Sequence, residues 1–133
     1  MHYRNNIKIL FDLRNLHLTI SVVIVALVAI IYGFLPNLLF DVTVITPDEN
    51  SIFKALMGLY FSFATLWVLG LFNKKYWQMA TLTNFLFMFG LAFGRIVSLC
   101  LDGFPSPVFL FGTIGELTLG CYALYQLNNH KIK

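Results

Sequence analysis

The sequence predicts an all-α fold, an integral membrane four-helix bundle with its N- and C-termini in the cytoplasm. Three observations predict it. First, 59% of the 133 residues are hydrophobic and only 11% are charged, whereas soluble proteins average about 25% charged residues. Second, four apolar segments each approach the roughly 20 residues needed to cross a bilayer. Third, basic residues gather on one side of these segments. A chain of this length has room for one domain, residues 1–133.

The four spans are expected near residues 16–35, 52–72, 79–101 and 108–127. Each should be helical, because unpaired backbone N–H and C=O groups are too costly in lipid. The first apolar run is long for the core of a secretory signal and ends without a small-x-small cleavage pattern. It is therefore interpreted as a retained first span.

Residues at the turns predict where two of the helices begin. In "TPDEN", Thr46 is placed to cap a helix, Pro47 is its first residue, and Glu49 completes a capping box. The second helix should therefore start before its apolar stretch. In "DGFPSP", Ser106 is the predicted N-cap and Pro107 the first residue of the fourth helix.

Charge predicts the orientation of the bundle. One side carries seven basic residues and one acid: Arg4, Lys8, Arg14, Lys74, Lys75, Lys131 and Lys133, with Asp12. The other side carries Asp41, Asp48, Glu49 and Asp102, with Lys54 near its boundary. Cytoplasmic segments of membrane proteins are enriched in Lys and Arg, so both termini are expected in the cytoplasm.

The N-terminal segment "YRNNIKILFDLRNL" has two interpretations. Arg4, Lys8 and Asp12 recur every four residues, and apolar residues occupy another face. This pattern is typical of an amphipathic helix that lies in the membrane interface. An ordinary basic flank that only sets the topology explains the same residues, and both interpretations stay open.

Histidines, cysteines and interfacial aromatic residues give no sign of a metal or cofactor. No Cys/His cluster has the spacing of zinc ligands, so no metal site and no cofactor is predicted. His17 and His130, like Trp77 in the "NKKYWQ" turn, are expected as interfacial side chains. Cys100 and Cys121 should differ in depth by nearly 20 Å at about 1.5 Å per residue, so they are expected as free thiols.

The chain lacks the common catalytic motifs. It has no glycine-rich phosphate loop, no G-x-S-x-G elbow and no H-E-x-x-H pair. No catalytic residue is therefore predicted, and a non-enzymatic role is favoured. The basic residues follow membrane topology and form no groove-binding patch, which excludes nucleic-acid binding.

Small residues recur at helical spacing and predict close helix packing. They are Gly58 on the second span, Gly90 and Gly94 on the third, and Gly112 and Gly120 on the fourth. Small residues four apart let helix backbones approach closely. Packing inside one bundle is the first interpretation and a dimer interface is the second.

Two charges, Arg95 and Glu116, fall inside apolar spans. Arg95 lies seven residues before Asp102, about 10 Å from the outer turn, and Glu116 lies nine residues after Pro107, about 13 Å from it. Antiparallel neighbours therefore place both charges at similar depth. An unpaired charge in mid-membrane costs about 2.5–3.5 kcal/mol on insertion scales, so an Arg95–Glu116 contact is predicted.

Further polar residues predict a cluster around this pair. Asn84, Ser98 and Asp102 lie near the face of Arg95 on the third helix, and Lys54 could join from the second. Three interpretations compete: a structural ion pair, an outward-open pocket for a small anion or amphipathic ligand, and a proton or ion path through Glu116. The third is weakest, because the spans contain no second acid to continue a relay.

The run "GRIVSLCLDGFPSP", followed by Glu116, resembles a family of small bacterial four-helix membrane proteins known only as a domain of unknown function. The resemblance extends to "KALMGLYF", where the family more often has Arg than Lys54, and it excludes the basic N-terminal segment. The resemblance implies the four-helix fold and a bacterial inner (cytoplasmic) membrane. It implies no activity.

The function that these patterns favour is that of a non-enzymatic integral membrane protein. It would be an accessory subunit of a larger membrane complex or a homo-oligomer, held together by the Arg95–Glu116 pair. The alternative is binding or carriage of a lipid or small amphipathic ligand in an outward-facing polar pocket. Its candidate residues are Lys54, Asn84, Arg95, Ser98, Asp102 and Glu116. Membrane lipids are expected partners in both cases.

Overall fold

The computed structural model describes residues 9, 12–39 and 43–130, and these residues are predominantly α-helical without any strand. The helices are α2 (Leu16–Phe34), the short α3 (Pro36–Leu39), α4 (Pro47–Phe72), α5 (Lys74–Asp102) and α6 (Pro107–Asn129). The helices α2, α4, α5 and α6 are each long and apolar enough to cross a membrane. The expected all-α architecture with four spans is therefore confirmed. The suggested interfacial helix around Arg4 and Lys8 lies outside the described residues.

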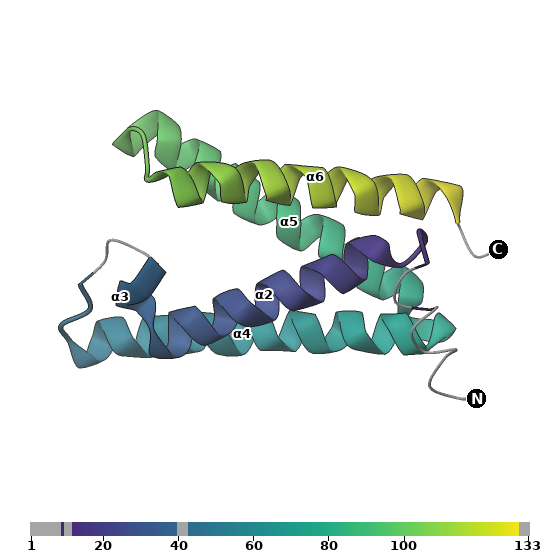
Figure 1. Cartoon of the computed structure of the whole chain (residues 1–133), viewed down its shortest axis with the longest axis horizontal. Coiled ribbons are helices and arrows are strands. Elements are labelled where there is room, and N and C mark those ends of the chain that lie inside the picture. The colour runs from purple at the N-terminus through teal and green to yellow at the C-terminus, as the bar shows by residue number, and fades with distance from the viewer. Residues whose placement is uncertain (1–8, 10–11, 40–42, 131–133) are drawn as a thin grey trace.

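The long helices form two pairs that α5 links (Figure 1). Helix α2 packs along α4, and α5 packs along α6. Helix α5 runs obliquely to the other helices and also contacts α4, which connects the two pairs. Contacts between α2 and α6 are few. The segment just before α2 also contacts α6: Leu13 O accepts hydrogen bonds from Tyr122 Oη at 2.7 Å and from Gln126 Nε2 at 3.1 Å. The two pairs are thus joined near the chain termini.

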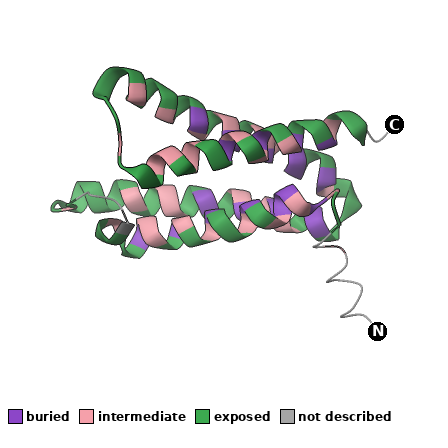
Figure 2. Ribbon diagram, turned by 45° about the horizontal axis from the view of Figure 1, so that its top comes forward, coloured by how far each residue is buried: buried purple, intermediate pink, exposed green. Residues whose placement is uncertain are grey.

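A small aromatic core lies between these helices. Phe87 packs against Tyr60 and Trp67, with ring centroids 5.0 and 5.3 Å away. Figure 2 shows that exposed residues cover much of every long helix. Many of these exposed side chains are large and apolar, for example Leu27, Phe93 and Ile114. Helices that are apolar on all sides suit a lipid environment.

The turns explain how the hairpins close. The capping box at α4 is confirmed, because Glu49 N donates to Thr46 Oγ1 at 3.2 Å and Thr46 N donates to Glu49 Oε2 at 2.9 Å. Helix α5 begins directly after Asn73, whose side chain accepts from Lys75 N at 3.0 Å. The third helix therefore starts at Lys74, five residues earlier than the apolar pattern predicts.

This early start changes the surroundings of two side chains that were expected at the interface. Trp77 lies in the first turns of α5 and is buried, with Nε1 donating to Asn15 Oδ1 at 2.9 Å. His17 is fully buried on α2. Both side chains are therefore enclosed by protein, because the beginning of α5 packs against the beginning of α2.

The capping box gives a matched pair of stability predictions. Thr46→Ala should lower the free energy of unfolding by about 1 kcal/mol, the usual cost of removing a capping side chain. Ser106 occupies the predicted N-cap position of α6, but its side chain makes no capping hydrogen bond. Ser106→Ala should therefore change stability by less than about 0.5 kcal/mol. Chemical unfolding of the two detergent-solubilised variants measures these free energies. An equal loss of stability in Thr46→Ala and Ser106→Ala would contradict the capping role of Thr46.

Candidate functional site

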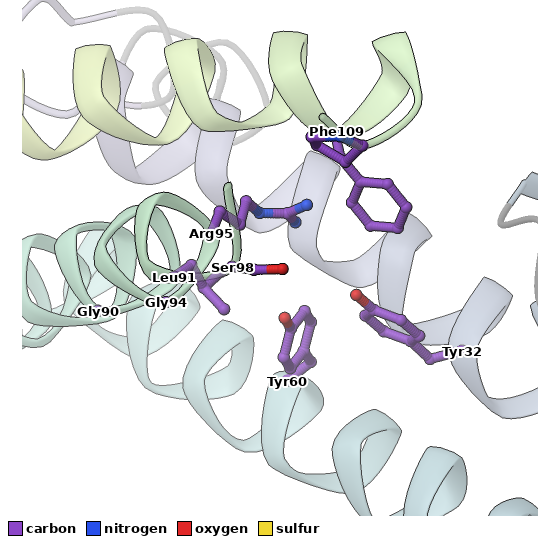
Figure 3. Close-up of a pocket in the computed structure, with 9 residues that line it drawn as sticks. Tyr32, Tyr60, Gly90, Leu91, Gly94, Arg95, Ser98 and Phe109 are labelled. Atoms are coloured by element: carbon purple, nitrogen blue, oxygen red, sulfur yellow. The ribbon is translucent and has the colours of Figure 1, made fainter. Parts of the chain in front are cut away.

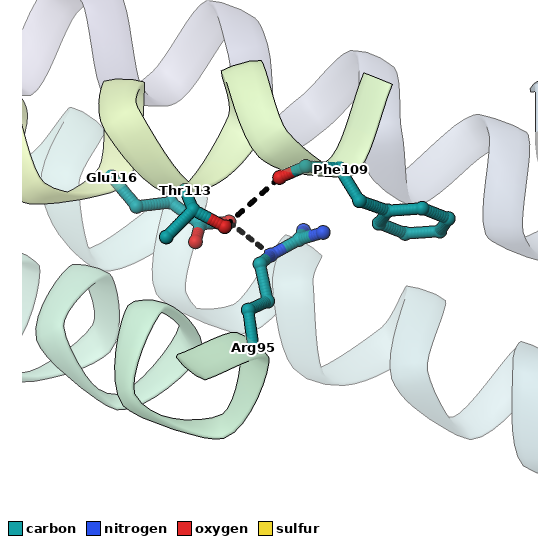
Figure 4. A network of polar contacts seen from close by, with 4 residues as sticks. All are labelled: Arg95, Phe109, Thr113 and Glu116. Atoms are coloured by element: carbon teal, nitrogen blue, oxygen red, sulfur yellow. Dashed lines mark hydrogen bonds and ion pairs between the residues drawn. The ribbon is translucent and has the colours of Figure 1, made fainter. Parts of the chain in front are cut away.

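The predicted contact between the two buried charges is present. Arg95 Nε on α5 donates to Glu116 Oε1 on α6 at 3.0 Å (Figure 4). The two side chains keep 22% and 11% of their surface exposed. The antiparallel α5–α6 hairpin places both residues at the same level, as the distances from the outer turn predict. Arg95 and Glu116 are called the charge pair below.

Residues of α6 shape the space that the guanidinium group occupies. A Cβ atom added at Gly112 would lie 3.8 Å from Cζ and Nη1 of Arg95, which is an ordinary van der Waals distance, so Gly112 lies directly beside the guanidinium. The ring of Phe109 lies 5.0 Å from Arg95 Cζ, which allows a cation–π contact. The nearest neighbours of Gly112 are therefore atoms of the Arg95 side chain and not the backbone of another helix.

The charge pair leaves hydrogen-bonding capacity unused. Arginine and a carboxylate often form two parallel hydrogen bonds, but here only Nε of Arg95 is engaged. Across the described residues, Nη1 and Nη2 of Arg95 make no hydrogen bond, and Oε2 of Glu116 is buried without a partner. The guanidinium group thus retains donors for another acceptor.

These donors face a cavity of about 410 Å³. Figure 3 shows the Arg95 guanidinium and the hydroxyl groups of Tyr32, Tyr60 and Ser98 directed toward the same space. Gly90 and Gly94 form part of the wall, and Pro105 and Phe109 close the side near the outer turn. The rings of Tyr32 and Tyr60 pack edge to face at 5.4 Å. This space is called the head-group cavity.

A second cavity of about 220 Å³ has both members of the charge pair in its wall. It shares Tyr60, Leu91, Arg95 and Phe109 with the head-group cavity. Its remaining walls come mainly from apolar residues of α2 and α6, and Glu116 is its one other charged residue within the described chain. This space is called the apolar chamber.

The structure gathers only part of the predicted cluster. Ser98 lines the head-group cavity and donates to Asp102 Oδ2 at 2.8 Å. Lys54 is exposed on α4, lines neither cavity and forms no ion pair with the described residues, so it does not join the cluster. Asn84 is fully buried about 16 Å along α5 from Arg95, and it too lines neither cavity.

Asn84 belongs instead to a buried polar group toward the chain termini. His17 Nε2 lies 3.3 Å from Thr81 Oγ1, and both residues are fully buried. Ser21 and Asn84 follow one turn later on the same two helices and are also fully buried. The i, i+4 spacing of His17 and Ser21 in an otherwise apolar span was a signal that sequence reasoning missed.

The glycines divide into two classes. A Cβ atom at Gly120 would overlap the ring of Phe89, so this position packs closely, as predicted. At Gly58, Gly90 and Gly94 a Cβ atom would meet nothing within 4 Å. The expectation that these three bring helices of one bundle together is therefore wrong, because their faces of α4 and α5 are open. A close approach that was not predicted occurs at Gly70, where a Cβ atom would overlap Ala80 Cβ.

A family model described as a domain of unknown function (DUF4345) matches residues 13–127. The chain belongs to this family. The DUF4345 match confirms the resemblance noted from the third and fourth helices, and it includes every residue that lines the two cavities. No curated protein and no solved structure matches the chain. The charge pair and its cavities therefore lie within the DUF4345 domain.

Proposed function

We propose that this integral membrane protein binds an anionic amphipathic ligand in the head-group cavity. The ligand class is a lipid or lipid-like molecule with a phosphate or carboxylate head group. One observation carries the proposal: Arg95 directs unused guanidinium donors into a cavity that three hydroxyl groups also face. This favours the ligand interpretation over a purely structural role for the charge pair.

The chemistry of the cavity suits an oxyanion. Guanidinium presents a planar set of donors that matches carboxylate and phosphate oxygens, and it is more weakly hydrated than ammonium. The hydroxyl groups of Tyr32, Tyr60 and Ser98 line the same space. A tyrosine hydroxyl can donate to a bound oxyanion, whereas the Ser98 hydroxyl donates to Asp102. Away from bulk water such charge-assisted hydrogen bonds are stronger. Glu116 keeps the guanidinium oriented while the site is empty.

The proposed location is a bacterial inner membrane, with the cavity in the outward-facing half. Lys74 and Lys75 lie at the α4–α5 turn, near the end where Leu13 contacts α6. Asp48 and Asp102 lie at the opposite helix ends, and Asp102 accepts a hydrogen bond from Ser98 in the wall of the head-group cavity. This asymmetry supports cytoplasmic termini. A ligand would then reach Arg95 from the outer leaflet.

The proposal is tested by measuring which lipids the protein retains. The full chain is inserted into nanodiscs of phosphatidylcholine with a minor fraction of phosphatidic acid, and retained lipid is identified by native mass spectrometry. Wild type should retain phosphatidic acid preferentially, and Arg95→Gln should reduce this preference at least tenfold, because charged hydrogen bonds contribute about 1.5–3 kcal/mol. Arg95→Lys, which keeps the charge but loses the planar fork, should show an intermediate loss.

Lys54→Gln is the matched control for Arg95→Gln. It removes one positive charge from α4, but Lys54 is exposed and lines neither cavity. The preference for phosphatidic acid should therefore stay at the wild-type level. No preference in wild type, or an equal loss in both variants, would overturn the proposal. Circular dichroism verifies that each variant remains helical.

Association with a second copy or a larger complex is the second candidate function. Its support is the open face at Gly58, where a small residue lets another helix approach closely. The same native mass spectra count the chains in each particle. A strictly monomeric protein, together with no co-purifying protein, would contradict this candidate.

A further inference from the structure

The apolar chamber continues the head-group cavity into the bundle. The two spaces meet at Arg95 and at the side chains of Tyr60, Leu91 and Phe109. The head-group cavity adds the hydroxyl groups of Tyr32 and Ser98 to this junction, whereas the walls that the apolar chamber adds are, apart from Glu116, mainly aliphatic and aromatic. A cavity with several polar groups in its wall therefore adjoins a more apolar one at Arg95. An amphipathic molecule has the same division between its head and its chain.

The chamber lies where α2 and α6 face each other with few contacts. Val25 and Val28 line it from α2, and Gly115 and Leu119 line it from α6. The hydrogen bonds between the α2 region and α6 occur at Leu13, at the other end of α6. Beside the chamber, the described residues form no hydrogen bond or ion pair from α2 to α6.

The residues at the edge of the chamber are exposed and apolar. Ile24 on α2 keeps 46% of its surface exposed, and Phe111 on α6 keeps 74%. In a bilayer these two side chains face hydrocarbon, so the chamber opens sideways between α2 and α6. An alkyl chain can enter along this route without leaving an apolar environment, which a charged head group alone cannot do.

The volume of the chamber limits what it can hold. An engineered apolar cavity of about 150 Å³ in another protein binds one benzene molecule. On the same scale, a chamber of about 220 Å³ has room for about nine carbon atoms. This corresponds to the first part of one alkyl chain, and a second chain has no space beside it.

We infer that the ligand is an anionic amphiphile with a single alkyl chain, an inference that rests on the proposed function. The head group lies at Arg95 in the head-group cavity. The chain lies in the apolar chamber and continues between α2 and α6 into the bilayer. A two-chain lipid binds less well, because its second chain stays outside and pulls the head group away from Arg95.

Three phosphate probes that differ in chain number test the inference. They are glycerol phosphate with no chain, lysophosphatidic acid with one and phosphatidic acid with two. Each is titrated into the 133-residue chain in a neutral detergent, and binding is followed by native mass spectrometry and by the rise in melting temperature. Lysophosphatidic acid should bind at least tenfold more tightly than either of the others. Equal binding of the one-chain and two-chain probes would overturn the inference.

Glycine substitutions separate the chain from the head group. Gly115 lines the apolar chamber and a Cβ atom there would meet nothing within 4 Å, so Gly115→Leu adds a side chain to the wall of the chamber at an open position. It should reduce lysophosphatidic acid binding at least tenfold while glycerol phosphate binding stays unchanged. Gly94 lines the head-group cavity but not the apolar chamber, so Gly94→Leu should weaken the binding of all three probes.

Gly58→Leu is the matched control, because Gly58 has the same open surroundings but lines neither cavity. It should leave the binding of all three probes unchanged. The two proposals fail in different ways. If no phosphate probe binds wild type, the proposed function fails as well. If the probes bind and neither chain number nor Gly115→Leu changes their affinity, only the single-chain inference is wrong.

Discussion

Gly70→Leu is expected to prevent the bundle from folding, and Gly70→Ala to lower the free energy of unfolding by about 1–3 kcal/mol. A Cβ atom at Gly70 would overlap Ala80 Cβ and would lie 3.4 Å from Tyr76 O and 3.5 Å from Trp77 Cα. These atoms belong to the backbone or to the root of a side chain, so no rotamer change moves them away. The α4–α5 hairpin would have to open.

The other close glycines should tolerate substitution better. A Cβ atom at Gly33 would overlap the sulfur of Met57, and one at Gly120 would overlap the ring of Phe89. A methionine side chain in particular is flexible and can change rotamer. Gly33→Ala should therefore cost less than Gly70→Ala. The ranking of the two alanine variants depends on whether the obstructing atom can move, and not on its distance from the added methyl group.

Size-exclusion chromatography of the detergent-extracted protein measures the amount of folded bundle, and thermal unfolding measures its stability. Gly58→Leu is the control, because it makes the same substitution on the same helix at a position where a Cβ atom meets nothing within 4 Å. It should give a wild-type yield of folded protein and a wild-type melting temperature. If Gly70→Leu eluted and melted like Gly58→Leu, the close packing of α4 on α5 would be wrong.

The spans and the charge pair could be predicted because their signals are local or depend on depth alone. Apolar length identifies a helix that crosses a membrane, and Thr46 with Glu49 identifies where one begins. The levels of Arg95 and Glu116 follow from counting residues back to one turn, since neighbouring antiparallel helices share a depth scale. No knowledge of the lateral arrangement was needed for either prediction.

The burial of individual faces could not be predicted in the same way. A helix that is apolar on all sides does not reveal which side faces lipid and which faces protein. The spacing of Gly90 and Gly94 therefore indicated a packed face, whereas both line an open cavity. His17 was expected at the interface because it begins a span, but the packing of α5 against α2 buries it beside Thr81.

Removing one charge of the Arg95–Glu116 pair is expected to destabilise the protein more than removing both. Glu116→Leu should lower the free energy of unfolding by about 3 kcal/mol, because it leaves a largely enclosed guanidinium group without its acceptor. Arg95→Met should cost a similar amount, because the buried carboxylate then has no cation. The double variant, Arg95→Met with Glu116→Leu, should be close to wild type, since apolar residues often replace a buried pair without loss.

Chemical unfolding of the four proteins gives the coupling energy of the pair. A double variant whose loss equals the sum of the two single losses would show that the charges do not act as a unit. Lipid retention in the same four proteins then separates structure from function. The double variant should fold and yet retain no excess of anionic amphiphile, because the head-group cavity has lost its cation. A folded double variant that still selected anionic lipid would leave the charge pair as a purely structural feature and would place any binding site elsewhere.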